Sequence, residues 1–378
     1  MKPRSYPLAA LVAAAITLTA LTSALPAQAA KPIVVGKVAA ITYSDVYRTA
    51  LKLTFPAVKP IKATKSVQWY RGSKAVSGAK ASTYPINPAD RGQSVFAKIT
   101  YKASGYATKI VTTPKIKVEG ANTSPYRLLW GDEFNDAAGA SPSSVWSAQE
   151  GDGRNFAAGA GWGNSELQYY LYSKAQQDGN GNLAINATSA DASNYNCYYG
   201  PCLWLSSKLV TKGKLGVKYG RIEARIKGAP GEGTWPAFWT LGANIDTTPW
   251  PNCGEIDIVE LKGNNPAYVW GTGHGPLSGG SGRGGSDILL TSTAAGYHRY
   301  AVDWTTSKLR FYVDDELYYT YTKKDADWVF DNEVYLILNL AMGGHWGGAV
   351  SLDLTSTTMN VDYVRVYSIS GLGQVITH

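Results

Sequence analysis

Residues 254–260 read GEIDIVE, so three carboxylates stand among branched apolar residues. β-Branched residues favour a strand, whose side chains point alternately to its two faces. Glu255 and Asp257 therefore share one face, whereas Glu260 is out of phase with them. A β-bulge formed by one extra residue around Ile258-Val259 would turn Glu260 to the same face, and bulges are common beside active sites. The stretch predicts three acids on one surface of a β-sheet.

A solvated acidic strand face is the alternative interpretation of residues 254–260. A strand facing water usually carries matching Lys or Arg, and like charges at this spacing repel each other. Carboxylates held under such repulsion are typical of functional sites. We therefore interpret the three acids as a candidate catalytic group.

Residues 1–29 have the pattern of a secretory signal peptide. Lys2 and Arg4 precede an apolar run, and residues 27–29 form the small-x-small cleavage pattern AQA. Thr, Ser and Pro dilute the run and no second apolar segment follows, so a permanent membrane anchor is not expected. We predict a secreted, extracellular, monomeric protein.

The three cysteines agree with an oxidising compartment. Cys197 and Cys202 flank the turn Tyr198-Tyr199-Gly200-Pro201, and we expect them to form a disulfide. Cys253 has no obvious partner and is expected to be a buried small apolar residue. So few thiols do not suggest a metal site.

The net charge of +8 is unevenly distributed. Residues 31–119 carry 16 Lys and Arg against three acids, which leaves the remainder of the mature chain acidic. These cations are spread along the segment and form no stripe, so nucleic acid is not an expected partner. Contact with anionic cell-wall polymers is plausible for an exported protein, and a merely solvated surface is the alternative.

Residues 30–119 alternate short β-rich runs with Gly, Pro and Ser turns, which predicts a small β-sandwich. The string Val67-Gln68-Trp69-Tyr70-Arg71, followed by Tyr84 and Asp90-Arg91-Gly92, resembles the bacterial immunoglobulin-like modules of secreted enzymes. The resemblance implies a buried Trp69 and a role as a spacer or an adhesion module.

A polar linker with Gly and Pro, residues 120–126, ends this module. Eleven of the twelve Trp lie beyond it. Residues 127–370 show recurring alternating strands, little helical periodicity and Gly-rich connections. This pattern predicts an all-β domain of two packed antiparallel sheets.

Two carboxylates flanking a bond are the minimum apparatus for glycoside hydrolysis, which needs no cofactor. The acid and the nucleophile need different pKa values at one pH. The third acid, Asp257, could hydrogen-bond to a neighbour and help to keep Glu260 protonated while Glu255 stays charged. The distance between the two glutamates poses a problem. A strand rises by about 3.3 Å per residue, so the backbones of Glu255 and Glu260 should lie roughly 16 Å apart. A retaining pair needs its carboxyl groups about 5–5.5 Å apart. A bulge, sheet curvature and long side chains must close this gap.

Aromatic residues accompany the acid strand. Trp235 and Trp239 fall on one face of an expected strand, and Trp250 and Trp346 lie near Gly and Pro turns. Flat rings suit the apolar faces of pyranoses. Any one of these Trp could equally belong to the core, but four of them around the acids favour a sugar-binding surface.

Four segments resemble, in this order, those of glycoside hydrolase family 16, with its laminarinase-like endo-β-1,3-glucanases as the nearest branch. They are Trp130–Phe134, Gly161–Tyr170, Trp235–Trp239 and Gly254–Glu260. The resemblance runs from about Tyr126 to Tyr367. It implies a concanavalin-like β-jelly-roll with a cleft across its concave sheet, and a retaining double-displacement mechanism.

The resemblance also implies roles for single residues. Glu255 matches the nucleophile, Asp257 the assisting acid and Glu260 the acid/base. Their spacing has one residue more than E-x-D-x-E, the feature that separates laminarinase-like from lichenase-like members. The positions that match substrate contacts are Asn164, Trp235, Trp239, Trp250, His274 and Trp346.

Two further features of the family bear on this chain. Many members bind a structural calcium through groups that match Glu133 and Asp362, for which a surface salt bridge is the alternative. Ser165 stands where the family usually carries Asn, which affects the substrate contacts near Asn164 and not the chemistry.

These features predict a secreted endo-acting hydrolase of internal β-1,3 linkages in a laminarin-like β-glucan. The alternatives are the same fold acting on β-1,3-1,4-glucan or a galactan, a non-catalytic glucan-binding protein, and a cell-wall adhesin acting through the basic module. A non-catalytic relative would be expected to lack one or both glutamates, so the presence of Glu255 and Glu260 favours the enzyme.

Overall fold

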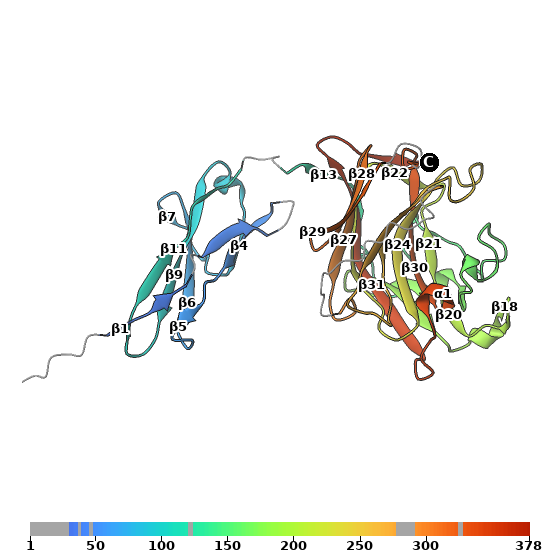
Figure 1. Ribbon diagram of the computed structural model, residues 1–378, viewed down its shortest axis with the longest axis horizontal. Coiled ribbons are helices and arrows are strands. Elements are labelled where there is room, and N and C mark those ends of the chain that lie inside the picture. The colour runs from blue at the N-terminus through green and yellow to red at the C-terminus, as the bar shows by residue number, and fades with distance from the viewer. Residues whose placement is uncertain (1–29, 37–38, 45–47, 120–123, 277–291, 324–327) are drawn as a thin grey trace, which may run out of the picture. The chain divides into compact units, whose positions relative to one another are not determined.

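The computed structural model describes residues 30–36, 39–44, 48–119, 124–276, 292–323 and 328–378. The predicted signal peptide and residues 120–123 of the predicted linker lie outside the described residues. The chain forms two compact units, each built from strands (Figure 1). The first unit contains the described residues up to Thr42, Lys52–Tyr84 and Gly92–Val118, and the second contains Tyr43–Leu51, Pro85–Arg91 and the described residues of Glu119–His378. Within the described ranges, no helix has the length and apolar character needed to cross a membrane.

The N-terminal strands form one sheet of five strands and one of three. The larger sheet consists of β11 (Lys109–Thr112), β9 (Ser94–Lys102), β6 (Thr64–Arg71) and β7 (Lys74–Ala75), with β12 (Ile116–Lys117) paired to β9. The smaller sheet consists of β3 (Ala40–Tyr43), β4 (Ala50–Thr54) and β8 (Thr83–Pro85). The remaining elements are β1 (Lys31–Pro32) paired to β10 (Tyr106–Ala107), β2 (Val34–Val35) paired to β5 (Val58–Lys59), and the 3-10 helix η1 (Pro88–Asp90).

Trp69 joins these two sheets. Its side chain is fully buried and stacks on Tyr84 with 5.1 Å between the ring centroids. Its indole Nε1 donates a hydrogen bond to the carbonyl oxygen of Ala81 over 2.9 Å. Because Trp69 lies in β6 and Tyr84 in β8, this contact packs one sheet against the other. The immunoglobulin-like class of the module stays a prediction.

The second unit contains two large sheets, which form separate layers in Figure 1. The ten-stranded sheet runs β15 (Gln168–Tyr170), β20 (Trp204–Ser206), β17 (Leu183–Thr188), β31 (Ser356–Ile369), β23 (Gly220–Lys227), β27 (His298–Trp304), β28 (Lys308–Val313) and β29 (Glu316–Thr322), with β13 (Tyr126–Asp132) on β31 and β16 (Ala175–Gln177) on β17. The eight-stranded sheet runs β14 (Ser147–Ala148), β21 (Lys208–Val210), β30 (Val334–Met342), β24 (Thr234–Gly242), β25 (Glu255–Glu260) and β26 (Trp270–His274), with β22 (Leu215–Lys218) on β30 and β32 (Gln374–Thr377) on β22.

Short elements connect these strands. They are the hairpin of β18 (Asn196–Cys197) and β19 (Gly200–Pro201), the 3-10 helices η2 (Ala160–Gly163), η3 (Tyr172–Lys174) and η4 (Ala192–Asn194), and the single-turn helix α1 (Gly344–Gly347). The S–S bond between Cys197 and Cys202 is 2.08 Å long, and the thiol of Cys253 is free and buried.

Strand β30 shows how the sheets share one core. All nine of its residues are buried. Leu336, Leu338 and Leu340 point into the apolar core between the sheets, whereas Ile337 packs on the opposite face beside Trp239. Each fully buried Leu stabilises the fold by about 1.5–3 kcal/mol. This central strand is therefore a rigid support for its neighbour β24 and, through β24, for the acid strand β25.

Candidate active site

Strand β25 carries a β-bulge where the sequence predicts one. On the β24 side, Phe238 pairs with Val259 and Trp239 pairs with Asp257, which leaves Ile258 as the extra residue. The register on the β26 side also shifts between Asp257 and Glu260. The predicted bulge is therefore confirmed.

The bulge separates the apolar from the acidic side chains of β25. Its three aliphatic residues, two of them consecutive, are buried in the core between the sheets. In a regular strand Val259 would leave that core and the Glu260 carboxyl would enter it, which is strongly unfavourable for a charged group. With the bulge, Glu255, Asp257 and Glu260 share the face that points away from the core, here called the acid-bearing face.

Strand β26 places His274 directly opposite Glu255. Its Nε2 lies 3.0 Å from Oδ2 of Asp257 and 3.8 Å from Oε1 of Glu255. Glu255 is also hydrogen-bonded to Asp257 and to the side chain of Trp250, which is 54% exposed. Glu255, Asp257 and His274 thus form one connected cluster with an aromatic ring at its solvent edge.

A row of indole rings flanks Glu260. Trp235 of β24 donates from Nε1 to Oε1 of Glu260 over 3.1 Å. The Trp235 ring lies 5.0 Å from that of Trp346 in α1, which in turn lies 5.1 Å from that of Trp270 in β26. Nζ of Lys262 stands 4.5 Å from the centroid of Trp346, a cation–π contact that holds this ring in place.

The three carboxyl groups interact electrostatically and resist ionisation together. Burial, and then the charge of Asp257, raise the pKa of Glu255 to about 8. Burial, and then the charge of Glu255, raise the pKa of Glu260 to about 7. Burial raises the pKa of Asp257 well above its ordinary value. The cluster therefore retains protons near neutral pH, so it can present a carboxylic acid and a carboxylate at the same time.

Comparison with known proteins identifies the family. Residues 164–365 match the model of glycosyl hydrolases family 16. This chain belongs to that family.

Individual relatives agree with the family 16 assignment. A beta-glucanase of Rhodothermus marinus is 39% identical over 259 residues, which cover 64% of this chain and 85% of the relative. A glucan endo-1,3-beta-glucosidase A1 of Niallia circulans is 36% identical over 64% of this chain and 37% of its own length. The solved endo-beta-1,3-glucanase of Pyrococcus furiosus has a TM-score of 0.59 and 37% identity, and the match covers 67% of this chain and 96% of that one. The family 16 chain is a glycoside hydrolase, and the predicted all-β jelly-roll class is confirmed.

Sequence reasoning missed a network beside the acid-bearing face of this family 16 domain. Glu166 is buried and accepts hydrogen bonds from Asn164 Nδ2 (3.0 Å), Gln168 Nε2 (2.7 Å) and Tyr170 Oη (3.3 Å). Burial raises the pKa of Glu166. Asn164, a predicted substrate contact, is thus held by a partner that the sequence reasoning did not single out.

Lys208 of β21 was also missed. Its ammonium Nζ lies between two indoles, 4.1 Å from the ring centroid of Trp162 and 5.0 Å from that of Trp239. Burial lowers the pKa of Lys208 to about 8, against the charges of Glu166 and Glu255, which raise it. Lys208 is therefore a buried cation whose charge interacts with Glu166 of this network and with Glu255 of the acid cluster.

The predicted contact residue Trp239 is tied to the same region. Its Nε1 donates to Oδ1 of Asn339 over 2.7 Å, and Nδ2 of Asn339 donates to the hydroxyl of Tyr170 over 3.1 Å. Tyr170 in turn donates to Glu166. The six predicted contact residues are consequently split into two groups, with Asn164 and Trp239 in this network and Trp235, Trp250, His274 and Trp346 around the acids.

The two residues predicted to hold calcium are engaged by arginines. Both oxygens of Glu133 accept hydrogen bonds from Arg365 at 2.7 Å, and Asp362 pairs with Arg225. Guanidinium groups neutralise both carboxylates, so these side chains match the salt-bridge alternative and do not fit a cation shell. Elsewhere in the described residues, ligand atoms of Glu255, Asp257 and His274 lie within 4.8 Å of one another, and this group consists of two predicted catalytic acids and a predicted substrate contact.

Proposed function

We propose that this family 16 chain is an endo-acting hydrolase of β-1,3-glucan that works by double displacement with retention of configuration. The observation that carries the proposal is the bulged strand β25, which presents Glu255, Asp257 and Glu260 on one face beside a row of indole rings. Two carboxyls of different protonation and flat apolar surfaces are what glycoside hydrolysis requires. The names of the relatives, which include an endo-1,3-beta-glucosidase and an endo-beta-1,3-glucanase, support the linkage.

In the first step the Glu255 carboxylate attacks the anomeric carbon of the sugar. The bond from that carbon to the glycosidic oxygen breaks, and the Glu260 carboxylic acid gives its proton to the leaving oxygen. Burial raises the pKa of Glu260 to about 7 and that of Glu255 to about 8, so the two carboxyls share protons near neutral pH and the pKa order does not assign their roles. The assignment of Glu255 as nucleophile and Glu260 as acid rests on their places in the family motif. The product of this step is an ester between the sugar and Glu255.

In the second step water hydrolyses that ester. Glu260, now a carboxylate, removes a proton from the water. The water oxygen attacks the anomeric carbon, and the bond from that carbon to Glu255 breaks. Asp257 acts on Glu255 through their hydrogen bond, and His274 lies 3.0 Å from Asp257. In this scheme Asp257 and His274 hold Glu255 in position, and no metal or organic cofactor takes part.

Chemical rescue distinguishes the two glutamates. We expect Glu255→Gly to lose at least about a thousandfold in kcat, since it lacks the nucleophile. On an activated β-glucoside, azide should enter the vacated space and give the α-glycosyl azide. Glu260→Gly with azide should instead give the β-azide, because the glycosyl ester still forms and azide replaces water. Interchanged products would reverse the two roles, and an inverted sugar from the wild type would exclude retention.

The substrate alternatives are tested by product analysis on laminarin, lichenan and agarose side by side. The proposal expects internal cleavage of laminarin, with a rapid fall in chain length. Faster cleavage of lichenan or of agarose would favour the β-1,3-1,4-glucan or the galactan alternative. Wild-type protein that binds laminarin and releases no reducing ends would favour the non-catalytic alternative.

We further propose that the chain is exported and that its N-terminal module is an immunoglobulin-like spacer or adhesion unit. The signal-peptide pattern of residues 1–29 and the disulfide between Cys197 and Cys202 support export. The 16 Lys and Arg of residues 31–119 support binding to anionic cell-wall polymers. Such binding should be strong in low salt and lost in high salt, whereas a spacer should not bind at any ionic strength.

A further inference from the structure

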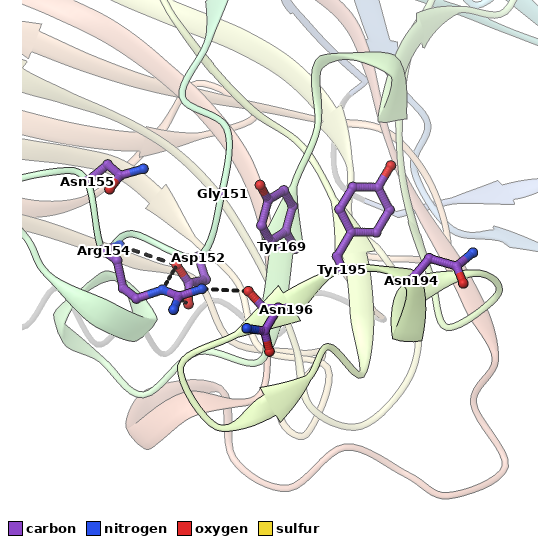
Figure 2. Close-up of a pocket in the computed structure, with 8 residues that line it drawn as sticks. All are labelled: Gly151, Asp152, Arg154, Asn155, Tyr169, Asn194, Tyr195 and Asn196. Carbon is purple, nitrogen blue, oxygen red and sulfur yellow. Dashed lines mark hydrogen bonds and ion pairs between the residues drawn. The ribbon is translucent and has the colours of Figure 1, made fainter.

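A cavity lies on the loops around β15, and its lining includes none of the three acids and none of the flanking indoles. Its volume is about 440 Å³, within the range of roughly 300–1,000 Å³ that is usual for small-ligand sites. Figure 2 shows the residues that line it, which come from the loop after Gly151, from β15 and from the segment that joins η4 to β18. They are Gly151, Asp152, Arg154, Asn155, Tyr169, Asn194, Tyr195 and Asn196.

Tyr169 shows that this cavity is separate from the network of Glu166. It lies in β15 between Gln168 and Tyr170, whose side chains both hydrogen-bond to Glu166. Successive side chains of a strand point to opposite faces. Tyr169 therefore points away from that network, and the cavity that it lines lies on the other side of the strand.

The walls of the cavity are fixed by hydrogen bonds. Gly151 exchanges two backbone bonds with Tyr170, of 2.9 and 2.8 Å. Nε of Arg154 donates to Oδ1 of the buried Asp152 over 3.0 Å, and its Nη2 donates to the carbonyl oxygen of Asn196 over 2.5 Å (Figure 2). These bonds tie the loop after Gly151 to the hairpin that begins at Asn196. The adjacent disulfide of Cys197 closes that hairpin, so the cavity is formed before any ligand arrives.

The loop that carries Asp152 cannot easily rearrange. Gly153 has a φ of +93°, and a Cβ at this position would come within 2.3 Å of the carbonyl oxygen of Gly159. Only glycine fits this close approach. The loop packing thus fixes the position of the Arg154 and Asp152 pair.

The chemistry of the lining suits a neutral polyhydroxylated ligand. The charge of Arg154 is matched by that of Asp152, so the cavity offers no unbalanced charge to an anion. Among the described residues, none forms a hydrogen bond with the side-chain amides of Asn155, Asn194 and Asn196, which leaves donors and acceptors for hydroxyl groups. The rings of Tyr169 and Tyr195, 4.9 Å apart, add flat apolar surface.

We propose that this cavity is a second binding site for a neutral glucan chain, distinct from the acid-bearing face. The proposal rests on the proposed function, since it assigns the same class of substrate to both sites. A chain held in the cavity keeps the enzyme on a long or insoluble polymer after each cleavage. A short oligosaccharide gains nothing from the second site, because it is hydrolysed without needing to be retained.

The test compares a cavity variant with a matched control in the full chain. The variant is Asn194→Ala with Asn196→Ala, and the control is Asn135→Ala, another exposed asparagine that does not line the cavity. Retention on insoluble β-1,3-glucan is measured in a Glu255→Gln background, so that the polymer is not digested. Each variant without that background is assayed for kcat/KM on laminaritetraose. We expect about tenfold weaker retention of the cavity variant, unchanged kcat/KM and no effect of the control.

Equal retention of the cavity variant and the control would overturn the second site. Loss of kcat/KM on laminaritetraose would also overturn it, because the cavity would then belong to the hydrolytic site. A direct check is titration with laminaritetraose followed by NMR, in which the resonances of Tyr169 and Tyr195 should shift in the Glu255→Gln protein. Failure of the proposed function is seen separately, as absence of reducing ends when the wild type acts on β-glucans.

Discussion

The indole of Trp235 donates a hydrogen bond of 3.1 Å to Glu260 from the strand next to the one that carries this acid. A hydrogen bond to the ionised form lowers the pKa of a carboxyl group, and here it opposes burial, which raises that pKa to about 7. The same ring lies beside that of Trp346, with 5.0 Å between the ring centroids. A residue predicted to contact the sugar is therefore also hydrogen-bonded to the predicted acid/base and lowers its pKa.

Trp235→Phe should move the alkaline limb of the pH profile. The ring face stays while the hydrogen bond is lost, so the pKa of Glu260 rises further and the acid form persists to higher pH. We expect the fall in kcat/KM above about pH 7 to shift upwards relative to the wild type. The measurement is kcat/KM on laminarin from pH 4 to 9.

Trp239→Phe is the matched control, because its indole donates to Asn339 and not to an acid. Its alkaline limb should coincide with that of the wild type. Equal shifts in both variants, or no shift in Trp235→Phe, would contradict the role of the Trp235 hydrogen bond.

Stability should fall as the pH rises from about 4.5 to about 8. The pKa of Glu255 is about 8 in the folded protein against an ordinary value of 4.5, so in this window the unfolded chain has released a proton that the folded chain keeps. Because the unfolded state then binds fewer protons, the free energy of unfolding decreases with pH. Glu255→Gln removes this group, and its free energy of unfolding in urea should depend less on pH. The control is the exposed acid variant Glu316→Gln, and a wild-type curve that rises through the window would refute the prediction.

Insertion of one Ala after Val259 should abolish hydrolysis. One more residue after the bulge turns Glu260 away from the acid-bearing face, whereas deletion of Ile258 would give a regular E-x-D-x-E strand that keeps the three acids on one face. We expect at least about a thousandfold loss of kcat on laminarin from the insertion. Folding of the insertion variant is checked by its near-UV circular dichroism.

Val259→Ala is the companion variant for the bulge, since it trims a buried side chain and keeps the number of residues. It should destabilise the protein by about 1–3 kcal/mol in urea unfolding and retain most of the activity. An insertion variant that hydrolyses laminarin as fast as Val259→Ala would show that the phase of Glu260 is not needed.

Lys208 and Glu166 should couple in a double-mutant cycle. Lys208→Met leaves the buried Glu166 carboxyl without its nearby cation, and Glu166→Gln leaves the buried ammonium without its nearby anion. Each single variant should therefore lose stability, and the double variant should lose less than the sum of the two single losses. We expect a coupling energy of about 0.5–3 kcal/mol from urea unfolding, and strict additivity would contradict the pairing.

Trp69→Ala should destabilise the N-terminal unit without affecting hydrolysis. Truncation of a fully buried Trp costs about 3–5 kcal/mol. Calorimetry should show one transition moving to lower temperature while the other stays in place, and kcat on laminaritetraose should not change. A single transition that moves as a whole would contradict the independence of the two units.

The acid strand shows how far the sequence could predict this structure. Alternation of apolar and acidic residues in 254–260 was enough to predict a strand and to locate its bulge, because both follow from local burial. Residues 235–239 likewise predicted a strand with Trp235 and Trp239 on one face, because alternation along a strand is a local pattern. The all-β class required only many such alternating segments.

Lys208 and the cavity around β15 could not be predicted in this way. Lys208 stands in the sequence SSKLV without any flanking signal, and its position between Trp162 and Trp239 depends on contacts among distant segments. Trp270 had a signal that was overlooked, since it lies four residues before His274 and so on the same strand face. Glu166 lay inside a segment that resembled the family but carried no separate clue to its buried hydrogen bonds.

The bulge at Ile258 also selects the neighbour of Glu260. On β26, His274 stands opposite Glu255 before the register shift, and Trp270 stands opposite Glu260 after it. An unshifted register from the same His274 pair would bring Glu260 opposite Val269. The extra residue therefore decides both the face of the sheet on which Glu260 lies and the aromatic ring beside it.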